Sequence, residues 1–153
     1  MTGAALAPGR VGIAVARWNE AITRRLLAGA ERCCTERGVA AADLEIVWTS
    51  GAWELPVIAR SFLARGDFAA VVALGAVVRG ETPHFDYIAG ETARGLMTLQ
   101  VEYGVPVGFG VLTCDTMEQA LARAGGAAGD KGHEAAAAAL DAAAALARHA
   151  RPR

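Results

Sequence analysis

The sequence predicts one α/β domain, a three-layer sandwich in which helices cover both faces of a four-stranded parallel sheet. Four short apolar runs, rich in Val, Ile and Ala, alternate with segments in which apolar residues recur every three or four positions. The turns that connect them are short, as in parallel sheets with helical crossovers. With 153 residues, of which 54% are hydrophobic, the chain is long enough to bury a core of this kind.

Strands and helices are predicted to alternate after a flexible arm at residues 1–9, so a single domain is expected at 10–153. Buried strands are predicted at 11–16, 44–49, 69–78 and 107–112. Helices are predicted at 20–37, 55–66, 83–103, 116–124 and 134–148, with a glycine-rich turn at 125–132. Gly108 and Gly110 predict close approach of another backbone or a ligand to the last strand. Four strands also leave exposed sheet edges, which the N-terminal arm of a neighbouring subunit could extend.

Composition and charge argue against several classes of function. The net charge of −1 is unlike that of a nucleic-acid binder, which needs a strongly basic face. No apolar run approaches the ~18–20 residues that a membrane span needs, and no segment resembles a secretory signal. Three cysteines, with Cys33 and Cys34 adjacent, fit neither a disulfide framework nor a zinc site. We therefore expect a reducing, cytoplasmic compartment, with the cysteines as small apolar fillers.

The stretch Leu74–Ile88 carries the clearest signal for chemistry. A buried strand ends there in a glycine turn, after which Thr82 is expected to cap a helix with Pro83 at its first position. Such a turn presents free backbone N–H groups at the carboxyl end of a parallel sheet, where anions bind. His84, in the first turn, could both accept and donate a proton near neutral pH. Taken alone, a histidine beside Phe85 also fits a residue that only packs.

Several motifs follow strands or begin helices in a fixed order: Arg17-Trp18-Asn19, Ser50-Gly51-Ala52-Trp53-Glu54, Gly80–Tyr87, Gly110–Thr113 with Glu118–Ala120 and Arg123–Gly125, and Gly129–Gly132. Together they resemble the 6,7-dimethyl-8-ribityllumazine synthase family, over residues 11–146. The resemblance implies a flavodoxin-like fold and the penultimate step of riboflavin biosynthesis. In that step 5-amino-6-(D-ribitylamino)uracil condenses with 3,4-dihydroxy-2-butanone 4-phosphate, with loss of phosphate and water. No metal and no organic cofactor are implied.

The resemblance also implies site residues, which fall into two groups. Those expected from one subunit are His84 for proton transfer, Trp18, Ala52, Trp53, Glu54, Val77 and Val78 for the pyrimidine and ribityl chain, and Gly80, Glu81 and Thr82 for phosphate. Those expected from the adjacent subunit are Phe109 and Lys131 on the substrate and Arg123 on the phosphate. A flat uracil needs an aromatic face, and a phosphate needs N–H groups and a guanidinium.

Each assignment has a plainer alternative. Trp18 could be a strand-end anchor, and Glu54 could simply favour a helix N-terminus. Arg123 could interact with the C-terminal end of a helix, and Lys131 could be a solvated loop charge. For the whole chain, the alternatives to an enzyme are a non-catalytic flavin or lumazine carrier and a purely structural shell protein.

The resemblance implies self-assembly with an active site shared between subunits. We expect pentamers built around the 85–103 helices and, because the 125–131 turn has no insertion, a sixty-subunit icosahedral shell. Riboflavin synthase is a candidate partner; nucleic acid and membrane are not. Two positions depart from the family pattern, with Asp130 in place of the usual asparagine and Ala127 where many members have lysine.

Overall fold

The computed structural model describes residues 9–150 and confirms the predicted parallel sheet. Its strands lie in the order β2-β1-β3-β4 and comprise β1 (Arg10–Ala16), β2 (Leu44–Thr49), β3 (Phe68–Val78) and β4 (Val107–Cys114). Every pair is parallel, and Ala14 of β1 lies opposite Val47 of β2 and Ala73 of β3. Apart from Gly9, the expected N-terminal arm lies outside the described residues.

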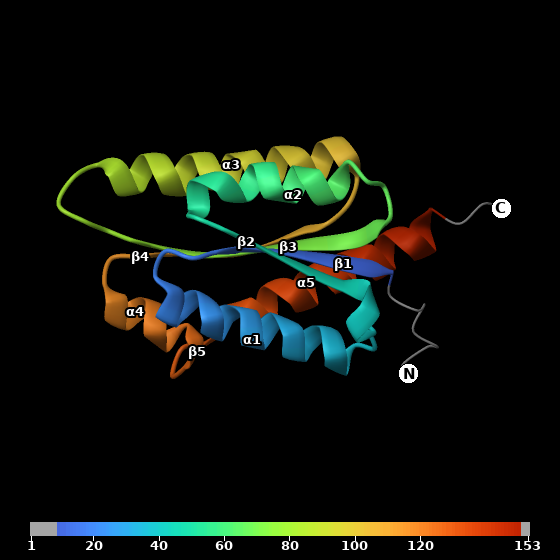
Figure 1. Cartoon of the computed structure of the whole chain (residues 1–153), viewed down its shortest axis with the longest axis horizontal. Helices are drawn as coiled ribbons and strands as arrows, with labels where there is room; N and C mark the ends of the chain where they lie inside the picture. Colours follow the sequence, from blue (N-terminus) through green and yellow to red (C-terminus); the bar gives the residue numbers. More distant parts are fainter. Residues whose placement is uncertain (1–8, 151–153) are drawn as a thin grey trace.

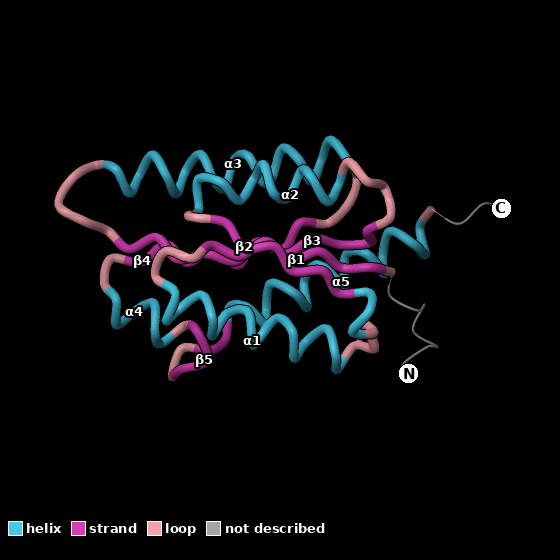
Figure 2. Tube along the Cα trace, viewed as in Figure 1, coloured by secondary structure: helices cyan, strands magenta, loops and turns pink. Residues whose placement is uncertain are grey.

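Helices cover both faces of the sheet, so the predicted three layers are confirmed (Figures 1 and 2). One face carries α2 (Leu55–Leu63) and α3 (His84–Tyr103). The other carries α1 (Glu20–Glu36), α4 (Met117–Ala122) and α5 (Lys131–His149). Two short 3-10 helices, η1 (Ala41–Asp43) and η2 (Ala52–Glu54), flank β2. In the described part of the chain, none of the helices combines the length and apolar character needed to cross a bilayer.

The core consists of two clusters, one on each face of the sheet, because alternate residues of a strand point in opposite directions. Ile13 and Val72 pack against α1 and α5, whereas Ala14 and Ala73 pack against α2 and α3. Phe62 of α2 is buried and meets Phe68 edge to face with ring centroids 5.0 Å apart. All three cysteines are buried and none forms a disulfide bond with another, as expected of apolar fillers.

The layer between the sheet and α5 is very thin. A Cβ atom built at Gly108 would lie 2.4 Å from the carbonyl oxygen of Ala135, which confirms the close backbone approach expected at this strand. A Cβ atom at Gly132 would lie 2.0 Å from the carbonyl oxygen of Leu26 in α1. The alanine-rich α5 therefore packs almost backbone to backbone on both neighbours.

The predicted 125–132 turn was wrong in detail, because it contains a small antiparallel hairpin, β5 (Ala124–Gly126) and β6 (Gly129–Asp130). Helix α5 begins at Lys131, three residues before the predicted start. The carboxylate of Asp130 accepts a hydrogen bond of 3.2 Å from the backbone N–H of His133 and so caps the helix. Thr116 caps α4, since its hydroxyl accepts from the Gln119 N–H at 3.1 Å.

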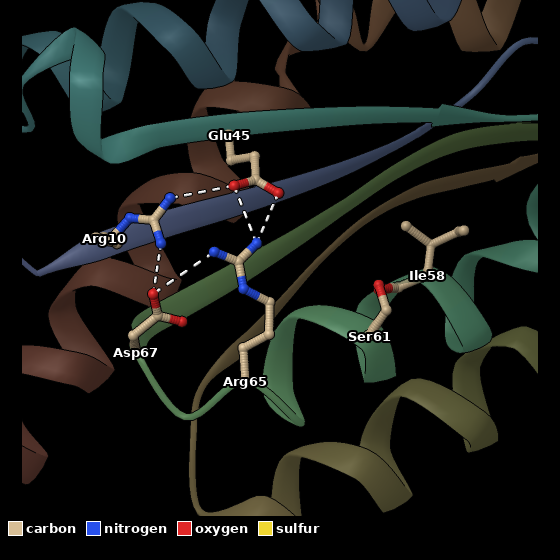
Figure 3. A network of polar contacts seen from close by, with 6 residues as sticks. All are labelled: Arg10, Glu45, Ile58, Ser61, Arg65 and Asp67. Carbon is tan, nitrogen blue, oxygen red and sulfur yellow. Dashed lines mark hydrogen bonds and ion pairs between the residues drawn. The ribbon is translucent and has the colours of Figure 1, made fainter.

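The amino end of the sheet is tied together by four charged residues, as Figure 3 shows: Arg10, Glu45, Arg65 and Asp67. Arg10 binds both Glu45 (3.1 Å) and Asp67 (2.5 Å), and Arg65 binds Glu45 at 2.9 Å. Both guanidinium groups also lie over the ring of Phe68, at 4.6 and 4.9 Å from its centroid. This network connects the starts of β1, β2 and β3 at the end of the sheet opposite to the predicted active site.

Candidate active site

The loops that follow the four strands meet at one end of the sheet, which we call the carboxyl edge (Figure 1). Backbone hydrogen bonds continue the sheet pairing into these loops, because the N–H groups of Arg17 and Trp18 donate to Thr49 and Ser50 at 2.8 and 2.9 Å. On the other side, the Arg79 N–H donates to Cys114 at 2.8 Å. The sites predicted after β1, β2 and β3 therefore share one edge.

Trp18 is held at this edge but is not buried. Its indole ring lies on Gly51, since a Cβ atom at Gly51 would come within 2.5 Å of Cε3. The next residue, Asn19, adopts a left-handed backbone (φ 63°), and its Nδ2 donates to the carbonyl of Ala76 at 2.9 Å. The contact with Gly51 is compatible with a strand-end anchor, but 65% of Trp18 remains exposed. The ring is free to stack on a flat ligand.

The segment after β2 forms the short helix η2, whose backbone is fixed from two sides. The buried hydroxyl of Thr92 in α3 donates to the carbonyl of Ala52 at 3.2 Å. Oε1 of Glu54 accepts a hydrogen bond of 3.0 Å from the Gly51 N–H, so the helix-start alternative describes part of its role. Trp53 is 54% exposed beside them. The segment thus offers a fixed carboxylate and an exposed ring.

Val77 and Val78 end β3 and are both half-buried. They pack into different clusters, Val77 on the face covered by α2 and α3, and Val78 on the face covered by α1, α4 and α5. Their side chains therefore point to opposite faces of the sheet, although their backbones lie together at the carboxyl edge.

The loop at residues 80–83, which we call the 80–83 loop, leads from β3 into α3 and is exposed throughout, as is His84. The helix begins at His84, so Pro83 is its N-cap and not its first residue, because the ψ of Pro83 is 2° and not helical. The Thr82 hydroxyl accepts from the His84 N–H at a long 3.4 Å. The start of α3 provides N–H groups suited to an anion, with His84 beside them.

The structure adds Arg79, which sequence reasoning did not single out. Its Nε donates to Oδ1 of Asp115 at 2.8 Å, and its Nη2 lies 3.4 Å from Oδ1 of Asp86. The hydrogen bond to Asp115 raises the pKa of Arg79 above its ordinary value. The sequence signal for Arg79 was its position as a cation directly before the glycine turn. Its two carboxylate partners come from other segments, so the sequence did not identify them.

The three residues expected from a neighbouring subunit do not join His84 within one chain. Phe109 is 38% exposed and pairs with Ala73 in the middle of β3, away from the carboxyl edge. Arg123 and Lys131 lie together on the other face of the sheet from α3, where the Lys131 N–H donates to the Arg123 carbonyl at 2.8 Å. Nη1 of Arg123 donates to the Gln119 carbonyl at 3.0 Å, as in the helix-end alternative.

Arg123 nevertheless lies near the end of β4. Burial raises the pKa of the Cys114 thiol at that end, and the positive charge of Arg123 opposes this rise. The described residues contain no group of three His, Cys, Asp or Glu side chains placed to hold a metal ion. A hollow of about 420 Å³ does occur, but it lies between α2 and α3, where Val57, Arg60, Glu91 and Arg94 line it. None of the predicted site residues lines it.

Comparison with known families identifies the family of the chain. The profile of the family described as 6,7-dimethyl-8-ribityllumazine synthase matches residues 8–147, which is nearly the whole chain. The four-stranded parallel sheet with helices on both faces is the flavodoxin-like fold that the sequence motifs implied. The chain therefore belongs to the 6,7-dimethyl-8-ribityllumazine synthase family, whose members act in riboflavin biosynthesis.

Proposed function

We propose that this chain is a transferase that condenses 5-amino-6-(D-ribitylamino)uracil with 3,4-dihydroxy-2-butanone 4-phosphate and releases phosphate and water. The observation that carries the proposal is the grouping at the carboxyl edge of an exposed indole, a fixed carboxylate and a helix start with a histidine. Each feature matches one part of the two substrates. The family match over residues 8–147 supports the same reaction.

In this proposal the residues of one chain divide the work. Trp18 stacks on the pyrimidine, and the backbone of Ala52 with Trp53 and Glu54 holds the ribityl chain, whose hydroxyls can donate to the carboxylate. Gly80, Glu81 and Thr82 bind phosphate mainly through backbone N–H groups, because the Glu81 carboxylate itself would repel it. Val77 and Val78, at the end of β3, border the pyrimidine.

His84 is the proposed proton-transfer residue. Imine formation, phosphate loss and ring closure each move a proton, and an exposed imidazole in the first turn of α3 can serve each step in turn. Holding both substrates on one edge supplies much of the remaining acceleration, since positioning can contribute ~7–11 kcal/mol.

We further propose that Phe109, Arg123 and Lys131 complete the site of an adjacent subunit. Their positions support this, because Phe109 pairs with Ala73 in the middle of β3, and Arg123 and Lys131 lie on the face of the sheet opposite to α3. Exposed apolar residues on α2 and α3 support an interface on that face; they are Val57 (62% exposed), Met97 (57%) and Val101 (74%). We expect pentamers there and a sixty-subunit shell beyond them, with riboflavin synthase as a candidate partner. Sedimentation at the mass of a lone pentamer would contradict the shell.

The test mixes purified protein with the two substrates and follows the absorbance of the lumazine product, with the uncatalysed rate subtracted. His84→Ala should lower kcat by roughly a hundredfold or more, as expected for loss of a general acid–base. His149→Ala is the matched control, because His149 is exposed in the last turn of α5, far from the carboxyl edge. A rate of product formation no higher than in buffer would refute the proposed catalytic activity. Tight binding of the product without turnover would indicate a carrier. An unchanged rate in His84→Ala would refute the proton-transfer role alone.

A further inference from the structure

Arg79 connects three segments around the 80–83 loop. Its guanidinium binds Asp115, directly after β4, at 2.8 Å and approaches Asp86, in the first turn of α3, at 3.4 Å. It also lies 4.4 Å from the ring centroid of Phe85 in the same turn. Asp115 is itself fixed, since its N–H donates to Oε1 of Gln119 in α4 at 2.8 Å. Arg79 therefore links the end of β4 to the start of α3.

The 80–83 loop has little else to hold it. All four of its residues are exposed, and a Cβ atom at Gly80 would meet nothing within 4 Å. In the described structure its side-chain hydrogen bonding amounts to the 3.4 Å contact between the Thr82 hydroxyl and the His84 N–H. A glycine-containing loop with so few contacts samples many conformations unless its two ends are fixed.

We propose that Arg79 is a positioning residue, which orients the 80–83 loop and the first turn of α3 by binding Asp115 and Asp86. The inference rests on the proposed function, in which that loop binds phosphate. Two carboxylates already surround the guanidinium, so its charge is largely neutralised and it is a poor phosphate ligand itself. Its effect on phosphate reaches the ligand through the loop backbone.

Two variants test the proposal. Arg79→Met removes both ion pairs but keeps an apolar chain against Phe85, and Asp115→Ala removes the principal partner. Arg37→Met is the matched control, because Arg37 also forms an exposed ion pair between two elements, with Asp141 of α5 at 2.6 Å, but away from the carboxyl edge. The measurements are KM for each substrate, kcat, and the inhibition constant for inorganic phosphate.

Both test variants should raise KM for the phosphorylated ketone and the inhibition constant for phosphate by about two- to fivefold, as expected for the loss of an exposed ion pair. KM for the uracil should match that of Arg37→Met. If Arg79 bound phosphate directly, Asp115→Ala would free its charge and strengthen phosphate inhibition, which would overturn the proposal. An equal rise in KM for both substrates would overturn it as well, since it would indicate general damage.

Hydrogen exchange separates this proposal from the proposed function. Amides in a peptide covering residues 79–90 should exchange faster in Arg79→Met than in wild type, with no such change in Arg37→Met. This readout requires no turnover. If the wild-type protein makes no lumazine, the proposed function fails, and unchanged exchange in Arg79→Met would refute the positioning role by itself.

Discussion

Gly51→Ala offers a direct test of the proposed stacking by Trp18, because it moves the ring without touching it chemically. The new Cβ atom would lie 2.5 Å from Cε3 and 2.8 Å from Cζ3 of Trp18, well inside van der Waals contact. The backbone at Gly51 is extended (φ −141°, ψ −178°), so alanine fits it without strain. The hydrogen bond from the Gly51 N–H to Glu54 can persist. The indole ring is therefore the part that must move.

The magnitude follows from the exposure of the ring. Since 65% of Trp18 is already exposed, the side chain can swing into solvent at little cost to folding. Loss of an aromatic stack costs about 0.5–1.5 kcal/mol, which corresponds to roughly a two- to twelvefold rise in KM. The rise should be confined to the uracil, because the 80–83 loop lies after a different strand.

The assay is steady-state formation of lumazine with each substrate varied in turn, together with thermal unfolding. Gly90→Ala is the control, as a Cβ atom there meets nothing within 4 Å. Trp18→Phe should be milder than Gly51→Ala, because it keeps an aromatic face in place. An unchanged KM for the uracil in Gly51→Ala would refute the stacking role, and a rise only for the phosphorylated ketone would mean that the substrates are placed the wrong way round.

Three further predictions concern the scaffold. Gly132→Ala should destabilise the fold by about 1–3 kcal/mol in chemical denaturation, because its Cβ atom would clash with the Leu26 backbone at 2.0 Å. Stability equal to that of wild type would show that α5 can move freely. Asp130→Asn keeps the helix cap but loses the ion pair with Arg32 at 3.1 Å, so the free energy of unfolding should fall by less than about 1 kcal/mol. A higher free energy of unfolding would contradict this reasoning. Burial raises the pKa of Cys34 to about 11, so the unfolded chain loses its proton first and native stability falls as pH rises from about 9 toward 11. Relative to Cys34→Ala, the stability of wild type should therefore decline over that range, and a constant difference would rule out the linkage.

The sequence predicted the sheet well because its strands carry a local signal. Strands such as β3, buried along most of their length, appear as continuous apolar runs. Each helix begins where apolar residues start to recur every three or four positions. The predicted ends differ from the observed ones by only a few residues; β4, for example, runs to Cys114 and not to Leu112. The β5–β6 hairpin was missed because a glycine-rich stretch has no period, and its position depends on contacts with α1, α4 and α5.

The candidate site was predictable only in part, for a similar reason. Residues that follow the strands, such as Trp18 and His84, are placed by topology alone, and the structure brings the segments that carry them to one edge. Arg79 was not predictable, because its main partner, Asp115, lies 36 positions away and follows a different strand. Arg123 and Lys131 cannot be placed relative to a neighbour from a single chain. Their roles stay proposals.

The thin layer under α5 constrains how this sequence can diverge. Gly108 already has no side chain, and its partner Ala135 presents its carbonyl directly to it. A side chain at Gly108 cannot be accommodated by a smaller residue at 135, because the atom that it would meet is a backbone carbonyl oxygen. Substitutions that introduce larger side chains in this layer are therefore not neutral, because they require displacement of the whole α5 helix. Ala135 and Ala139, the buried alanines of α5 that meet Gly108, are therefore kept small by the sheet beneath them, whatever the base composition of the gene.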